Sequence, residues 1–172
     1  MAERESDPRE GARRIVGALE SAGVTLVPSV PDTWIGWLME PMRRSSRLRV
    51  VDVAREEEAI AIACGAHLVG ARAAVVIQNA GLLNSGAVIG SLVQLYRVPC
   101  FLLVSYRGDA RDPIYYHAAK GRATEPTLRA WGLRFARAQG PARIAAQIAE
   151  AYAEIETTQE PWVLLFSAED LV

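Results

Sequence analysis

The chain has 172 residues, of which 51% are hydrophobic, and this is enough for the core of one domain. Its 19 basic and 20 acidic residues give a formal net charge of −1, which argues against binding to nucleic acid or to a membrane surface. No apolar run approaches the roughly 18 residues of a membrane span, so we expect a cytoplasmic protein with a single domain over residues 1–172.

Helix and strand patterns alternate along the chain. Residues 8–23 predict an amphipathic helix, 24–30 a short β-branched strand, and 31–41 a short helix with tryptophans at helical spacing. The alternation then continues, with strands expected at 48–53, 73–78, 99–105, 133–138 and 161–167, and helices at 55–70, 84–96, 125–132 and 141–156.

This alternation predicts the α/β class, as an open, doubly wound parallel sheet of about six strands with helices on both faces. The strands near Val76, Leu103 and Leu164 are continuously apolar, which is typical of strands covered on both sides. The irregular stretch 105–124 is longer than a plain connection, and we interpret it as a candidate lid.

Ligands of such sheets bind beyond the carboxyl ends of the strands, so the turns that leave the strands deserve inspection. Four of these turns carry polar residues or glycine: "PSVPDT", "AREEE", "QNAGLLNSG" and "SYRGD". The second opens an alanine-rich helix with three glutamates. For Glu57 and Glu58 we favour a solvated first turn, where acidic side chains complement the helix dipole by ~0.3–1 kcal/mol each.

These turns contain five short motifs in a characteristic order, namely "VPDT", "REEEAIAIACGAHLVG", "IQNAGLLNSG", "YRGD" and a run from His117 through Gly121 to Thr124. With them the chain resembles the pyrimidine-binding domain of thiamine-diphosphate-dependent 2-oxo acid decarboxylases, in particular the sulfopyruvate and phosphonopyruvate decarboxylases. The resemblance spans most of the chain. It implies a carboxy-lyase that converts a small anionic 2-oxo acid into an aldehyde and carbon dioxide.

The resemblance also implies roles for single residues. Glu56 is expected to hydrogen-bond the pyrimidine ring nitrogen of thiamine diphosphate and to favour its imino tautomer, which is the catalytic role. A carboxyl group suits this task because it exchanges a proton with a weakly basic nitrogen. The further residues expected at the cofactor are Pro31, Gln78, Asn79, Gly81 and Asn84. Those expected at the substrate are Asp32, Thr33, Arg107 and His117, since arginine donors suit a sulfonate or phosphonate.

Two departures and one missing part qualify the resemblance. Leu83 and Ser29 stand where the family usually has glycine. The chain lacks a "GDG" turn with a later asparagine, the pattern that binds the diphosphate and Mg²⁺ in this family. We therefore expect no metal site here, a separate diphosphate-binding beta subunit that holds the Mg²⁺, and a hetero-oligomer of α2β2 or larger composition.

Two other readings stay open. The chain is alternatively a cofactor-free regulatory or binding module of the same fold, to which Leu83 points. A cysteine nucleophile would rest on Cys100, but we expect Cys64 and Cys100 to be buried thiols, and His67 to be a partly buried structural histidine. The sequence leaves open which 2-oxo acid is used, whether the aldehyde is released or joined to an acceptor, and the stoichiometry.

Overall fold

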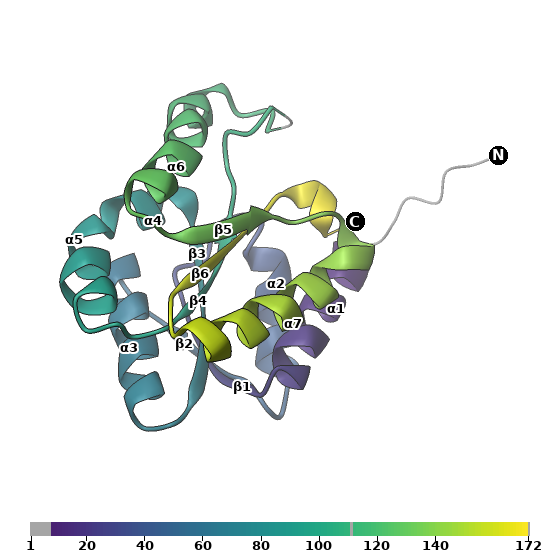
Figure 1. Cartoon of the computed structure of the whole chain (residues 1–172). Helices are drawn as coiled ribbons and strands as arrows, with labels where there is room; N and C mark the ends of the chain where they lie inside the picture. Colours follow the sequence, from purple (N-terminus) through teal and green to yellow (C-terminus); the bar gives the residue numbers. More distant parts are fainter. Residues whose placement is uncertain (1–7, 111, 172) are drawn as a thin grey trace.

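Six parallel strands form one sheet in a computed structural model that describes residues 8–110 and 112–171 (Figure 1). The order across the sheet is β2-β1-β3-β4-β6-β5. The strands are β1 (Val24–Ser29), β2 (Arg49–Asp52), β3 (Arg72–Gln78), β4 (Phe101–Ser105), β5 (Arg134–Arg137) and β6 (Trp162–Phe166). Every pairing is parallel, so the predicted α/β class and parallel sheet are confirmed.

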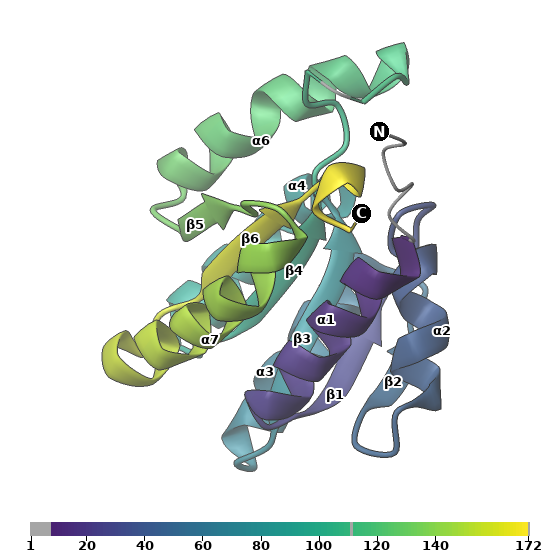
Figure 2. The same cartoon turned by 90° about the vertical axis from the view of Figure 1, so that its right-hand side faces the viewer.

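Helices cover both faces of this sheet. One face carries α1 (Pro8–Ser21), α2 (Gly36–Arg44) and α7 (Pro141–Thr158), which Figure 2 shows side by side in front of the strands. The other face carries α3 (Glu56–Leu68), α4 (Asn79–Asn84), α5 (Gly86–Val88), a π-helical segment (Ile89–Gln94) and α6 (Ala118–Ala130). Within the described ranges, no helix combines the length and apolarity needed to cross a bilayer.

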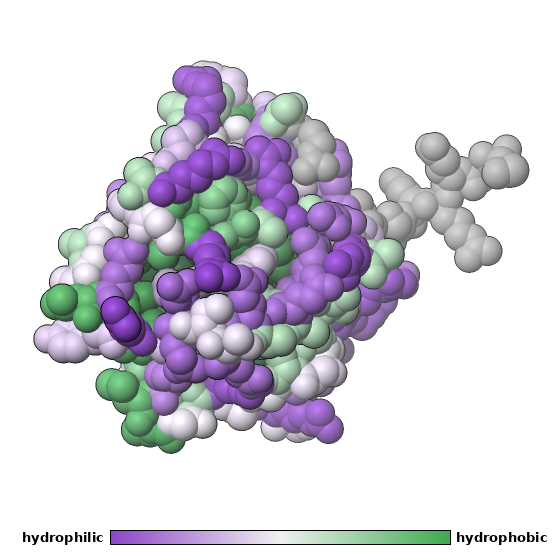
Figure 3. Space-filling model, viewed as in Figure 1, coloured by the Kyte–Doolittle hydropathy of each residue, from purple (hydrophilic) through white to green (hydrophobic). Residues whose placement is uncertain are grey.

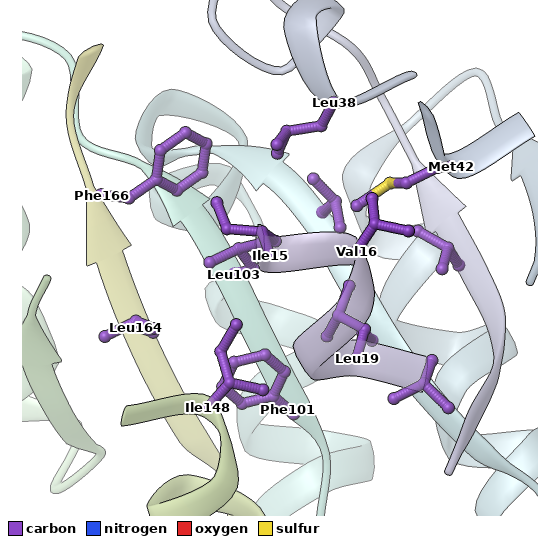
Figure 4. Packing of buried hydrophobic residues seen from close by; sticks show 14 of the residues in the cluster. Ile15, Val16, Leu19, Leu38, Met42, Phe101, Leu103, Ile148, Leu164 and Phe166 are labelled. Carbon is purple, nitrogen blue, oxygen red and sulfur yellow. The ribbon is translucent and has the colours of Figure 1, made fainter. Parts of the chain in front are cut away.

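The core under α1 and α7 illustrates why the apolar pattern folds this way. Ile15 and Leu19 of α1 are fully buried in one cluster with Leu103 and Leu164 of the sheet, and Figure 4 shows Ile15 beside Leu103. Burial of each such side chain stabilises the fold by about 1.5–3 kcal/mol. The strands β4 and β6 are buried along their whole length, as their continuous apolar runs predicted.

Two segments that were expected to be irregular are helical. The chain is already helical at Asn79, directly after β3, and α6 begins at Ala118, after a 3-10 turn at Tyr115–His117. The prediction of a helix starting at residue 125 was therefore wrong, because Pro126 lies inside α6 and does not begin it. Contacts of Gly121 with Gly108 and of Thr124 with Asn79 fix the first turns of this helix, and such tertiary contacts are invisible in a local pattern.

Candidate functional site

The strand order changes direction between β1 and β3, because β2 lies on one side of this pair and β4 on the other. A crevice outside the carboxyl ends of the strands is expected at such a switch point. Asp32 follows β1 and Gln78 ends β3, and the Gln78 side-chain amide donates a hydrogen bond of 2.9 Å to Asp32 Oδ2. The two predicted residues thus bridge the switch point.

Asp32 joins three strand ends. Its Oδ1 accepts the backbone N–H groups of Trp34 and Ile35, at 3.0 and 2.8 Å, which fixes the entry into α2. Its Oδ2 accepts the Gln78 amide and the hydroxyl of Ser105, the last residue of β4, at 2.8 Å. Carboxylates that accept several hydrogen bonds are held rigidly, so this residue ties the ends of β1, β3 and β4 together.

Arg107, Asp112 and His117 form a buried ionic cluster beside Asp32. Arg107 Nε donates to Asp112 Oδ2 at 2.9 Å, and His117 Nδ1 lies 2.8 Å from the same oxygen. Burial tends to raise the pKa of Asp112, but hydrogen bonds from Arg107, from His117 and from two backbone N–H groups outweigh it and hold this pKa well below its usual range. The Asp112 carboxylate is therefore charged at neutral pH.

The guanidinium of Arg107 lies close to two carboxylates and one aromatic ring. Besides Asp112, it lies 3.7 Å from Asp32 Oδ2 and sits over the ring of Trp34, with 4.1 Å between the guanidinium carbon and the ring centroid. This stacked contact is a cation–π interaction. Arg107 is thus held between two carboxylates and an aromatic face, and its side chain is only 7% exposed.

Asn79 lies fully buried at the start of α4. Its amide nitrogen donates to the carbonyl oxygen of Arg107 at 2.8 Å and to the hydroxyl of Thr124 at 2.9 Å. Its Oδ1 has no hydrogen-bond partner among the described residues. An unsatisfied buried polar atom costs about 1–3 kcal/mol.

Two glycines allow the loop after β4 to dock on the start of α6. Gly108 has a φ of +83°, and a side chain there would overlap the carbonyl group of His117. A side chain on Gly121 would overlap the carbonyl group of Gly108. One close approach of two backbone segments therefore explains both the glycine of the motif "YRGD" and Gly121 in the run from His117 to Thr124.

Lys120, which lies between these contacts, has a different environment from Arg107. Its Nζ donates a hydrogen bond of 2.6 Å to Gln78 Oε1, a neutral acceptor. Burial lowers the pKa of Lys120, and the nearby charge of Arg107 lowers it further, although Asp32 and Asp112 act in the opposite direction.

The three glutamates that open α3 have three different environments. Glu57 is half-buried and pairs with Arg55 at 3.0 Å, while Glu58 caps the helix by accepting the backbone N–H groups of Ala54 and Arg55. Glu56 is half-buried, and in the described parts of the chain no side chain or backbone group forms a hydrogen bond or ion pair with its carboxylate. Its side chain lies against Gly81, where a methyl group would overlap the carboxylate.

The remaining residues expected at the site lie nearer the surface. Pro31, Thr33 and Asn84 are exposed, at the ends of the same two strand-to-helix connections. Ser29, in place of a family glycine, is buried and donates a hydrogen bond of 2.7 Å to the carbonyl oxygen of Val76. The serine hydroxyl therefore joins β1 to β3.

Sequence reasoning missed Ser105 and Asp112, although both lie in the stretch 105–124 that it singled out. Ser105 carried a usable signal, since it is the last residue of a strand whose end faces the crevice. Asp112 carried none, because its partners depend on the path of the loop. The expectation for His67 was wrong, since this residue is exposed. Cys64 and Cys100 are buried and free, as predicted.

Known proteins resemble the chain in both sequence and fold. Residues 9–120 match the family described as thiamine pyrophosphate enzyme, N-terminal TPP binding domain. The chain is similar to the sulfopyruvate decarboxylase subunit alpha of Methanothermobacter thermautotrophicus, with 32% identity over 82% of this chain and 86% of that protein. The subunit alpha of Methanocaldococcus jannaschii is 29% identical over 92% of this chain and 94% of its own length.

Two longer proteins match as well. The phosphonopyruvate decarboxylase of Streptomyces viridochromogenes is 34% identical over 69% of this chain, which spans only 30% of that protein. Among solved structures, the 2-oxoglutarate:ferredoxin oxidoreductase from Magnetococcus marinus superposes with a TM-score of 0.66 and 14% identity, over 94% of this chain and 29% of that chain. The match to the oxidoreductase shows that the two chains share a fold.

Proposed function

Because the chain belongs to the thiamine pyrophosphate enzymes, through their N-terminal TPP-binding domain, we propose that it is the alpha subunit of a two-chain 2-oxo acid decarboxylase. In this proposal residues 1–172 form the pyrimidine-binding domain. The substrate is a small anionic 2-oxo acid of the sulfopyruvate or phosphonopyruvate type, and the products are the aldehyde and carbon dioxide. A separate beta subunit holds the diphosphate and Mg²⁺.

The observation that carries this proposal is the unpaired carboxylate of Glu56 against Gly81. Glu57 in the same turn pairs with Arg55, whereas the half-buried Glu56 has no such partner among the described residues. The buried, unpartnered Oδ1 of Asn79 lies in the same connection after β3. A ring nitrogen that shares a proton with the Glu56 carboxylate would supply the partner that this group lacks among the described residues.

In the proposed enzyme, Glu56 holds the pyrimidine ring, with Pro31, Gln78, Asn79, Gly81 and Asn84 at the two strand ends around it. When bound, thiamine diphosphate supplies the nucleophilic carbon and the electron sink that decarboxylation requires. Glu56 moves a proton between its carboxyl oxygen and the ring nitrogen. Asp32 fixes the strand ends, and the contact of His117 Nδ1 with Asp112 leaves Nε2 as the ring nitrogen available to substrate.

The surface of α3 supports a partner subunit. Ala61, Gly65 and Leu68 are exposed at a spacing that places them on one side of the helix, and Val69 beyond them is 82% exposed. Figure 3 shows strongly hydrophobic groups over the far end of α3 and beside the π-helical segment that precedes β4, where Leu95 is exposed. Because this apolar face runs along the helix that begins with Glu56, we propose that the beta subunit covers it.

The test is reconstitution of the two-chain enzyme. The purified chain with Mg²⁺, thiamine diphosphate and sulfopyruvate is expected to release no carbon dioxide. Addition of the beta subunit from the same source should restore the release. Decarboxylation by the chain alone would contradict the division of the site between two subunits.

A further inference from the structure

Among the described residues, Arg107 and Lys120 are the two cations in the network at the strand ends, and they differ in how their charge is satisfied. Arg107 is paired with Asp112 at 2.9 Å, approaches Asp32 at 3.7 Å and stacks on Trp34. Removing such a buried cation to bind another anion would leave two buried carboxylates without the positive charge that balances them. Arg107 is therefore suited to hold the loop in place.

Lys120 has no carboxylate partner in the described residues, and its one hydrogen bond runs to the neutral side-chain oxygen of Gln78. An ammonium group carries three N–H donors, so two of them remain for another acceptor. The side chain is half-buried, which makes its charge more costly than that of a fully solvated lysine. A bound anion would relieve this cost.

The position of the ammonium is defined from both sides. Gln78, which accepts its hydrogen bond, is itself held by Asp32, and the start of α6 is held by Asn79 through Thr124. The Lys120 Nζ atom is thus anchored beside Gln78, which ends β3. Gly81, which contacts Glu56, follows Gln78 three residues later in the chain.

We propose that Lys120 is the residue that recognises the anionic tail of the substrate, and that Arg107 acts as a positioning residue for the network around it. This assignment rests on the proposed function. A compact ammonium group with free donors suits a tetrahedral sulfonate or phosphonate as a point charge. A 2-oxo acid with an uncharged tail, such as pyruvate, gains nothing from this contact, so Lys120 sets the preference between the two substrate types.

The kinetic test compares sulfopyruvate with pyruvate in the assembled two-chain enzyme. Lys120→Gln is expected to raise KM for sulfopyruvate about tenfold or more, which corresponds to the loss of one charged hydrogen bond, and to lower kcat/KM for pyruvate much less. Lys120→Arg should retain most of the preference. Arg122→Gln is the matched control, because Arg122 is exposed on the same helix, and it should change neither substrate.

A binding measurement separates this assignment from the proposed function. 3-Sulfopropanoate carries the carboxylate and the sulfonate but no keto group, so calorimetry reports its affinity even if the assembled protein proves inactive toward sulfopyruvate. The wild-type protein is expected to bind it about tenfold more tightly than Lys120→Gln. Equal affinities, absence of binding to the wild type, or an equal kinetic loss for sulfopyruvate and pyruvate would each overturn the role of Lys120.

Discussion

The side chain of Glu56 packs against the backbone of Gly81 so closely that a methyl group at residue 81 would overlap its carboxylate. Glu56 follows β2 and Gly81 follows β3, and β1 lies between these two strands in the sheet. The contact therefore brings together two connections on the helical face that α3 and α4 share. It also places the Glu56 carboxylate, which has no hydrogen-bond or ion-pair partner among the described residues, in the space that a side chain at residue 81 would occupy.

Gly81→Ala is expected to displace the Glu56 carboxylate and to lower kcat by about tenfold or more, since small misplacements of catalytic groups have effects of this size. The fold should survive, because the end of a half-buried side chain can turn away. Decarboxylation kinetics and thermal unfolding of the assembled enzyme check both points. Gly17→Ala is the control, since a side chain there meets open space and should stabilise α1 by about 0.5–1 kcal/mol. Full activity of Gly81→Ala would contradict the arrangement.

Asp112→Asn should destabilise the protein by about 3–5 kcal/mol at neutral pH, because Arg107 loses its buried partner. The pKa of Asp112 is lowered in the folded state, so its contribution is fully present above the ordinary carboxyl pKa of about 3.9 and is lost as the pH falls through the lowered folded value. Urea unfolding at several pH values measures the difference between wild type and variant. A difference that does not shrink below about pH 4 would refute this linkage.

The double variant Leu68→Glu with Val69→Glu should abolish or weaken binding to the beta subunit, because it places charge on the apolar face of α3. The isolated variant should unfold at nearly the same temperature as the wild type, since both side chains are exposed. Size-exclusion chromatography of the mixed subunits checks assembly. Ala149→Glu, on the exposed side of α7 across the sheet, is the control and should assemble normally. Normal assembly of the double variant would exclude this face as the interface.

Native alkylation tests the reading in which a cysteine is the nucleophile. Interaction with Cys64 and complete burial raise the pKa of the Cys100 thiol, and both effects oppose formation of the reactive thiolate. Iodoacetamide should therefore modify Cys100 slowly in the folded chain. Cys64 should also react slowly, because its side chain is buried, and both should react completely in urea, as read by mass spectrometry. Rapid, stoichiometric modification of Cys100 under native conditions would revive the cysteine mechanism.

Sequence reasoning predicted the frame of the site because that frame follows from periodicity. Apolar runs of strand length alternate with helical patterns, and the ends of parallel strands necessarily meet at one edge of the sheet. Asp32, Gln78 and Arg107 could therefore be expected near one another from the sequence alone. Their contacts in the structure are direct or through a shared carboxylate.

The pairing of individual charges could not be predicted in the same way. Arg107 is bound by Asp112, five residues further along, and this contact depends on the path of an irregular loop with a left-handed glycine at Gly108. The start of α6 was hidden for a related reason, since Pro126 suggested a helix start that tertiary contacts of Thr124 move upstream. The sequence also does not show that Arg107 pairs with a carboxylate whereas Lys120 binds a neutral amide oxygen.

The central claim is that the Glu56 carboxyl acts on the cofactor, and turnover of Glu56→Gln in the assembled two-chain enzyme measures it most directly. We predict that the variant assembles with the beta subunit as the wild type does but loses about a hundredfold or more in kcat, as expected for removal of a proton-transferring group. Wild-type turnover in Glu56→Gln would contradict the claim and would favour a regulatory or binding module of the same fold.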